Sequence, residues 1–243
     1  MSRLKASLAA VELANPHDDA RWGEIIRSVI AANPWEDQAV YLQVTRGVAP
    51  REHAFPRGIK PTVFVSAGAL SRPPREQIEN GVAAITHEDF RWLRCDIKSI
   101  SLLASCMLKS LAVKLGAAEA ILLRDGFLTE AAASNVMIVS GGTVLAPPKS
   151  HLMLPGITYD VVLELMENSG VRHAMRPVTE AELRTADEIW LTSSSKEVLP
   201  VTTLDNQPVG HNDTAGKPGP FFRRVHALYQ EYKTNVMRAP AHG

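Results

Sequence analysis

Short apolar segments joined by tight turns occupy the middle of the 243-residue chain. Residues 118–123, 135–139 and 144–145 are candidate strands, and Asp125-Gly126 and Gly141-Gly142 are dipeptides typical of two-residue hairpin turns. Strands joined by such turns pair antiparallel, whereas a parallel sheet needs a long crossover between its strands. This part of the chain therefore predicts hairpins and argues against a doubly wound parallel sheet.

Helices and further strands flank these hairpins without a regular strand–helix–strand rhythm. Apolar residues at helical spacing predict helices at residues 4–11, 22–32, 102–115, 155–170 and 221–232. Predicted strands cover residues 41–45, 61–67, 81–87, 92–97, 171–178, 188–192 and 198–204. Thr179 and Glu182 have capping-box spacing and start one more short helix. The mixture predicts the α+β class.

The stretch Ser71-Arg72-Pro73-Pro74 predicts a linker, because adjacent prolines are stiff and extended. It divides the chain into a small α/β domain over residues 1–70, a linker over 71–75 and a larger α+β domain over 76–243.

The charge balance excludes several classes of partner. Lysine plus arginine and aspartate plus glutamate each total 26, so the formal net charge is zero. Nucleic-acid and membrane-surface binding normally need a basic excess, so we expect neither. No apolar run approaches the roughly 20 residues that span a bilayer. Only Cys95 and Cys106 are available for disulfides or structural zinc, so we expect a cytoplasmic protein without a metal site.

A loop bounded by prolines carries Arg51 and His53, two positions apart. Both side chains could point at one anion, and the planar fork of arginine matches a carboxylate. A pair of solvated loop residues is the plainer interpretation of these two positions alone.

Lys98 follows the apolar segment 92–97 and precedes a predicted helix. Ile97 and Ile100 flank it, and partial desolvation there would favour the neutral amine, a nucleophile able to form a Schiff base. A solvated lysine at a strand end is the plainer alternative.

Glu130 stands before the small residues Ala131-Ala-Ala-Ser134, which would let a flat ring approach the backbone. Farther along, Pro155-Gly156-Ile157-Thr158 opens a predicted helix, and the free N–H groups of a helix N-terminus bind phosphate. Ser193 and Ser194, at another predicted strand end, could add hydroxyl groups.

These segments together resemble the class IV aminotransferases, which are fold type IV pyridoxal-phosphate enzymes, and most closely their D-amino-acid (D-alanine) branch. The strings TRGxxPRxHxFP at residues 45–56 and RWLRCDIKS at 91–99 carry the resemblance, which extends to about Tyr232. It implies a two-domain fold with several dozen residues before the segment that matches Met1, so we expect the small domain to be truncated.

The resemblance also implies roles for particular residues. Lys98 corresponds to the lysine that binds pyridoxal 5′-phosphate covalently and then moves the substrate proton, and Glu130 to the acid that pairs with the pyridine nitrogen. The remaining cofactor contacts are a phosphate cup and an apolar residue against the ring: Arg3, Ile157, Thr158, Ser193 and Ser194 for the cup, and Leu154 for the ring. Arg51 and His53 correspond to the trap for the substrate carboxylate, offered across a homodimer interface.

The activity implied is transamination between a D-amino acid and a 2-oxo acid such as 2-oxoglutarate. Three alternatives remain open: an aminodeoxychorismate lyase, a branched-chain aminotransferase, or a truncated fragment that binds the cofactor without catalysis.

Overall fold

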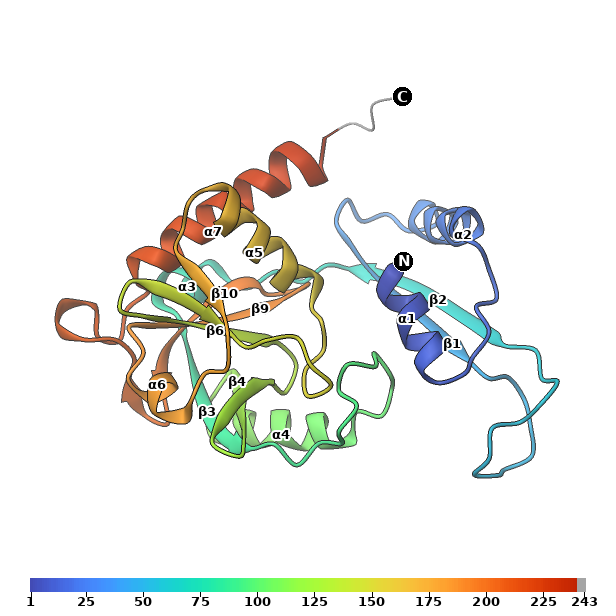
Figure 1. Cartoon of the computed structure of the whole chain (residues 1–243). Coiled ribbons are helices and arrows are strands. Elements are labelled where there is room, and N and C mark those ends of the chain that lie inside the picture. The colour runs from blue at the N-terminus through green and yellow to red at the C-terminus, as the bar shows by residue number, and fades with distance from the viewer. Residues whose placement is uncertain (240–243) are drawn as a thin grey trace. The chain divides into compact units, whose positions relative to one another are not determined.

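A computed structural model describes residues 1–239 (Figure 1). The chain divides into two compact units, Met1–Arg72 and Pro73–Gly243. The boundary falls inside segment 71–75, at the Pro73-Pro74 pair.

The first unit is two helices and a two-stranded antiparallel sheet: α1 (Ser2–Ala10), α2 (Asp19–Ala31), β1 (Gln38–Thr45) and β2 (Thr62–Ala69). Asp18 is the N-cap of α2, and its side chain accepts a hydrogen bond from the Arg21 amide at 2.8 Å. Trp22 has no exposed surface, and its indole N–H donates to Asn15 Oδ1 at 3.0 Å. Burial of this aromatic side chain stabilises the connection between α1 and α2.

The second unit contains a nine-stranded mixed sheet in the order β5-β4-β3-β10-β9-β6-β7-β8, with β11 paired to β10. The strands are β3 (Val82–Glu88), β4 (Glu119–Arg124), β5 (Phe127–Ala131), β6 (Asn135–Ser140), β7 (Thr143–Ala146), β8 (His173–Met175), β9 (Glu188–Ser193), β10 (Glu197–Leu204) and β11 (Gln207–Pro208). The pairs β4–β5, β6–β7 and β9–β10 are antiparallel, as the turn dipeptide Gly141-Gly142 predicts for β6–β7, while β3 runs parallel to β4 and β10. The predicted α+β class is confirmed.

Within residues 73–239, five α-helices accompany this sheet: α3 (Arg75–Asn80), α4 (Leu103–Lys114), α5 (Ile157–Asn168), α6 (Glu180–Arg184) and α7 (Pro220–Tyr232). Short helical turns follow at Asn212–Thr214 and Lys233–Met237. The predicted capping box of Thr179 and Glu182 is present at α6. Across residues 1–239, no helix is both long and apolar enough to cross a bilayer.

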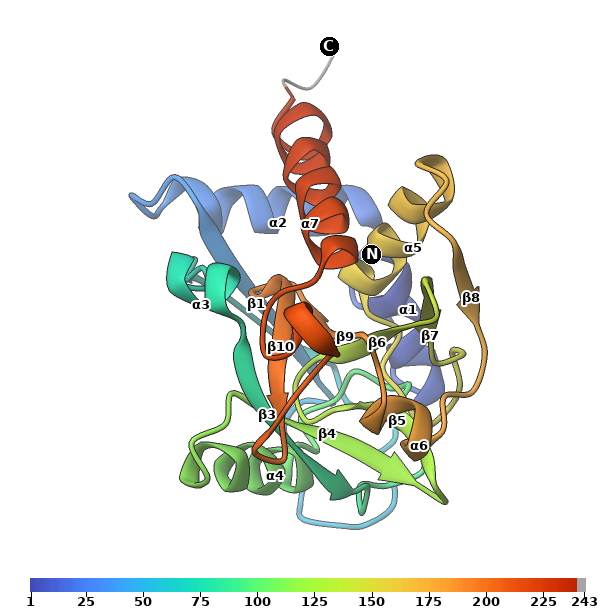
Figure 2. The same ribbon diagram turned by 90° about the vertical axis from the view of Figure 1, so that its left-hand side faces the viewer.

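Alternation along the strands gives the sheet two apolar faces. On β6, Val136 and Ile138 belong to the core enclosed with α6, whereas Met137 belongs to the core under α5 and α7. On β4, Leu122 packs instead with Leu108 of α4. Figure 1 shows α5 beside α7, and Figure 2 shows α4 along the part of the sheet that contains β3 and β4.

Some expectations of secondary structure were wrong. Residues 92–97 form a loop with a turn instead of a strand, because the Cys95 amide donates to the His151 carbonyl at 2.8 Å and not to a sheet neighbour. Only His173–Met175 of the predicted strand 171–178 pairs, along β7. Within residues 1–239, two strands and one α-helix that we did not predict are present: β5, β11 and α3.

Candidate functional site

The Glu130 carboxylate is the centre of a buried polar cluster in the second unit. Arg91 Nη1 donates to its Oε1 at 2.5 Å. Its Oε2 accepts from Asn135 Nδ2 at 3.0 Å and from the Leu154 amide at 3.1 Å. A carboxylate offers about four acceptor positions, so three donors leave room for one more.

A second carboxylate, that of Asp89, also binds Arg91. Arg91 Nε and Nη2 each donate to one oxygen of Asp89 at 2.9 Å, a bidentate pair, and Arg91 Nη2 also reaches the Leu152 carbonyl at 3.2 Å. Thr129 Oγ1 donates to Asp89 at 2.9 Å. Burial opposes the charge of Arg91, but its hydrogen bonds to Asp89 and the charge of Glu130 raise the pKa of the guanidinium above its ordinary value. Arg91 therefore remains positively charged between the side chains of Asp89 and Glu130.

Burial raises the pKa of Glu130 to about 7, although the charge of Arg91 and the Leu154 amide oppose the shift. A carboxyl group with a pKa in this range can exchange a proton with a bound ligand near neutral pH. Glu130 is therefore chemically suited to face a group that itself carries a dissociable proton.

This shift predicts a pH-dependent stability. Between about pH 4.5 and pH 7 the folded chain holds the Glu130 proton more firmly than the unfolded chain, so the free energy of unfolding falls as pH rises through this window. We expect the cofactor-free protein to lose about 1–3 kcal/mol between pH 5 and pH 8 relative to Glu130→Gln, which cannot titrate. Urea denaturation of both proteins at several pH values measures the difference. Parallel profiles would contradict the prediction.

The N-terminus of α5 approaches the same cluster. Asn135 Nδ2 also donates to the Leu154 carbonyl at 2.9 Å, which joins β6 to the segment before the helix. Gly156 is required there, since a Cβ atom at this position would lie 2.0 Å from Asn135 Oδ1. Gly156 supplies no side-chain cap, so the first amides of α5, at Ile157 and Thr158, form an uncapped helix start.

One buried hydroxyl group on β9 belongs to Thr192, the cross-strand neighbour of Asn135. Its Oγ1 makes no hydrogen bond within residues 1–239, although Thr192 is only 1% exposed. Ser193 and Ser194 follow directly, at the end of β9. The unpartnered hydroxyl, the uncapped helix and the position left at Glu130 fit a flat, phosphorylated ring such as pyridoxal phosphate.

Lys98 lies in the loop between β3 and α4 and is exposed, so the expected partial burial was wrong. The buried neighbour is Ile97, whereas Ile100 is exposed. The loop is held to the segment before α5 by the contacts of Arg91 with Leu152 and of Cys95 with His151. The second unit thus contains seven of the predicted site residues: Lys98, Glu130, Leu154, Ile157, Thr158, Ser193 and Ser194.

The other three predicted residues belong to the first unit. Arg3 is half-buried in α1. Arg51 and His53 lie in the exposed loop between β1 and β2. The side chain of His53 is 92% exposed, with its Nδ1 3.9 Å from Glu52 Oε1. Within this unit, the loop therefore leaves both side chains accessible to a ligand.

Our reasoning from the sequence missed Asp89, Arg91 and Asn135 as parts of the site. Arg91 lies in the string at residues 91–99 and Asn135 at the start of the predicted strand 135–139, and neither was assigned a role. A signal was present, since Asp89 and Arg91 are oppositely charged and two positions apart after an apolar strand, a spacing that suits a local ion pair.

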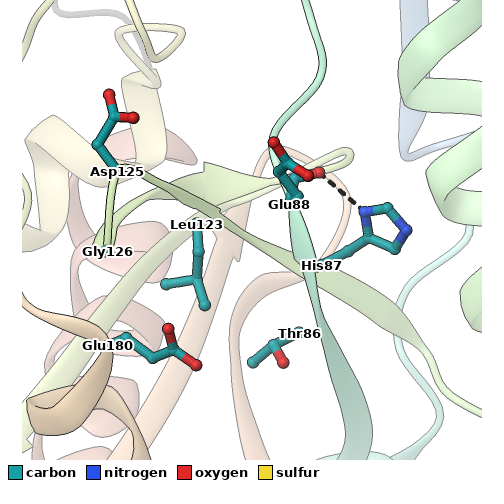
Figure 3. A pocket seen from close by; sticks show the side chains of 7 residues that line it. All are labelled: Thr86, His87, Glu88, Leu123, Asp125, Gly126 and Glu180. Carbon is teal, nitrogen blue, oxygen red and sulfur yellow. Dashed lines mark hydrogen bonds between the residues drawn. The ribbon is translucent and has the colours of Figure 1, made fainter.

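A polar hollow lies elsewhere, at β3 and the β4–β5 turn (Figure 3). Its lining consists of Thr86, His87, Glu88, Leu123, Asp125, Gly126 and Glu180. Figure 3 shows His87 beside Glu88, with Nδ1 2.8 Å from the Glu88 carbonyl oxygen. Within the described part of the chain, no three His, Cys, Asp or Glu side chains group closely enough to hold a metal ion. None of the predicted site residues lines this hollow.

Comparisons with known proteins indicate the family of the chain. The family model Amino-transferase class IV matches residues 1–204. The D-alanine aminotransferase of Bacillus licheniformis is 40% identical over 230 residues, which are 95% of this chain and 80% of that protein. The D-alanine aminotransferase of Listeria monocytogenes serotype 1/2a is 37% identical over 238 residues, 97% of this chain and 81% of that protein. A solved T.th. branched-chain amino acid aminotransferase with pyridoxamine 5′-phosphate has a TM-score of 0.84 at 26% identity, over 95% of this chain and 76% of that one.

Proposed function

The chain belongs to the class IV aminotransferases, which use pyridoxal 5′-phosphate, and from this premise we propose that it transfers the amino group of a D-amino acid to a 2-oxo acid such as 2-oxoglutarate. The observation that carries the proposal is the buried Glu130 carboxylate, held by Arg91, Asn135 and Leu154 beside an uncapped helix start. The substrate class is supported by the relatives named D-alanine aminotransferase, at 37–40% identity.

Glu130 and Lys98 would divide the proton chemistry. When bound, the protonated pyridine ring of the cofactor withdraws the electron pair left when the substrate Cα loses its proton. Glu130 would accept a hydrogen bond from the ring nitrogen at its remaining acceptor position and keep that nitrogen protonated. Lys98 Nζ would hold the cofactor covalently. Once the substrate amine displaces it, Lys98 Nζ would take the proton from the substrate Cα as a general base and deliver it to C4′ of the cofactor as a general acid.

The helix start and the β9 end would hold the phosphate. The Ile157 amide and the Thr158 amide and hydroxyl lie in the first turn of α5, where the helix dipole favours an anion. Ser193 and Ser194 would donate hydroxyl hydrogens, Arg3 would add a positive charge, and Leu154 would contact the ring.

The substrate carboxylate needs a separate anion site. Arg51 offers a planar fork and His53 a second donor, and both are accessible on the β1–β2 loop. A carboxylate held away from the reacting carbon would fix which face of the substrate presents its hydrogen, so this pair would decide the stereochemistry.

Spectroscopic titration tests the substrate class. D-alanine, and not L-alanine, is expected to change the visible absorption of the enzyme-bound cofactor, and 2-oxoglutarate to reverse the change. Arg51→Ala is expected to raise KM for D-alanine about tenfold or more, the loss typical of a charge-assisted hydrogen bond. A response to L-leucine but not to D-alanine would favour branched-chain transamination, the activity named for several similar structures.

An exposed apolar segment supports assembly into a homodimer. It surrounds Lys98 in sequence and consists of Phe90, Trp92, Leu93, Ile100, Leu102, Leu103 and Met107, each at least 46% exposed. Monomers rarely leave so many large apolar side chains in one stretch open to water, and we propose that a second copy covers them. Sedimentation is expected to give twice the 26.5 kDa chain mass, and a 26.5 kDa species at all concentrations would overturn the proposal.

A further inference from the structure

A second buried carboxylate, outside the site described above, belongs to Glu119, the first residue of β4. The residue has no exposed surface. Its Oε2 lies 2.5 Å from Lys196 Nζ, accepts from Ser134 Oγ at 3.1 Å and lies 3.7 Å from Lys109 Nζ. Lys196 Nζ also donates to Ser134 Oγ at 3.0 Å, which closes a triangle. A carboxylate removed from water is stable only with such hydrogen-bond and charge partners, so the side chains of this cluster depend on one another.

The cluster joins segments that carry proposed site residues. Lys196 ends the turn from Ser194 to Lys196 between β9 and β10, and Ser134 directly precedes Asn135, a ligand of Glu130. The Lys196 amide donates to Ser193 Oγ at 3.1 Å. Because Ser193 Oγ accepts this bond, its own hydrogen remains available for a ligand.

Glu197, the residue after Lys196, connects the end of the turn to the C-terminal helical segment. Glu197 has a left-handed backbone with φ of 57°. Its carboxylate accepts hydrogen bonds from Lys233 Nζ and Gln230 Nε2, both at 2.6 Å, in the C-terminal helical segment. Lys196 and Glu197 are thus fixed to different parts of the unit, and the turn between β9 and β10 is clamped from both sides.

We propose that Lys196, paired with buried Glu119, is a positioning residue that fixes the Ser193–Ser194 turn for the phosphate of the cofactor. The proposal rests on the proposed function, which assigns the two serines to the phosphate. The Lys196 ammonium group is engaged by Glu119 and Ser134, so it acts through the turn and not by touching the phosphate.

Comparison of two ligands tests the proposal, since pyridoxal lacks the phosphate of pyridoxal 5′-phosphate. The full chain, freed of bound cofactor, is titrated with each and followed by absorption. Lys196→Met is expected to raise the Kd of pyridoxal 5′-phosphate about 10-fold to 100-fold, because the displaced serine hydroxyls would lose a hydrogen bond to the charged phosphate, and to leave the Kd of pyridoxal within about twofold. Lys109→Met is the matched control, because this lysine faces the same carboxylate from α4, and is expected to change neither Kd.

Lys196→Met leaves the Glu119 charge with weaker partners, so the double variant Glu119→Gln/Lys196→Met provides a second test. It removes the unpaired charge and is expected to show the same selective loss of pyridoxal 5′-phosphate binding. An equal weakening of both ligands, or of neither, would overturn the positioning role.

Ser193→Ala/Ser194→Ala separates this proposal from the proposed function. Suppose that Ser193→Ala/Ser194→Ala raises the Kd of pyridoxal 5′-phosphate but not that of pyridoxal, whereas Lys196→Met raises neither Kd. The serines then bind the phosphate as proposed, and the positioning role of Lys196 is wrong. If Lys196→Met raises only the Kd of pyridoxal 5′-phosphate and the serine variant changes neither Kd, the serines do not bind the phosphate. That result would contradict both the positioning role and the part of the proposed function that assigns the serines to the phosphate. Selective loss in both variants supports the positioning role.

Discussion

Replacing Lys98 by alanine is expected to lower kcat for transamination at least about 1,000-fold, within the range contributed by a positioned acid–base group. The variant lacks both the covalent attachment point and the amine that would move the proton. Lys98 is exposed and lies in a loop, so its removal should leave the free energy of unfolding nearly unchanged. Steady-state kinetics with D-alanine and 2-oxoglutarate, together with urea denaturation, measure the two quantities.

Lys114→Ala is the matched control for Lys98, because it removes another exposed lysine, at the end of α4. We expect it to leave kcat unchanged. Borohydride reduction followed by peptide mapping adds a direct readout, with the cofactor attached to Lys98 in the wild-type protein. Residual activity of Lys98→Ala near the wild-type value, or attachment at another lysine, would contradict the role proposed for Lys98.

Arg91→Met is expected to lower the free energy of unfolding by about 3–5 kcal/mol, the usual cost of removing one partner from a buried ion pair. The methionine would leave two inaccessible carboxylates, of Asp89 and Glu130, without their shared cation. Arg124 cannot replace it fully, since it reaches only Asp89, at 3.3 Å. Urea denaturation of the cofactor-free protein is the measurement.

Arg94→Met is the control for Arg91, because it lies in the same loop but pairs with Asp96 at the surface, at 3.1 Å. Exposed pairs contribute at most about 1 kcal/mol, so we expect a change below that value. Adding Glu130→Gln to Arg91→Met should recover part of the lost stability, because the double variant has one buried charge fewer. Equal effects of Arg91→Met and Arg94→Met would show that the buried network does not stabilise the fold.

Local patterns in the sequence predicted local structure well. The capping box at α6, the turns at Asp125-Gly126 and Gly141-Gly142, and the helices that became α2, α4, α5 and α7 depend on residues a few positions apart. The same reasoning failed for residues 92–97, where an apolar segment suggested a strand. There the backbone partner is His151, more than 50 positions away, and no local pattern identifies it.

The fold class, the family and the residues proposed for chemistry follow from the amino-acid sequence alone, because the segments around Lys98, Glu130 and Thr158 carry the residue types of the family in the same order. The hydrogen-bond partners of Glu130 become visible only in the folded chain. Arg91 and Asn135 come from segments 39 and 5 positions away, and Leu154 from a third, and they meet at one carboxylate because the sheet brings these segments together. The same holds for Glu119 and Lys196, 77 positions apart. Burial makes such pairs obligatory, since a carboxylate removed from water requires partners that only the folded chain supplies.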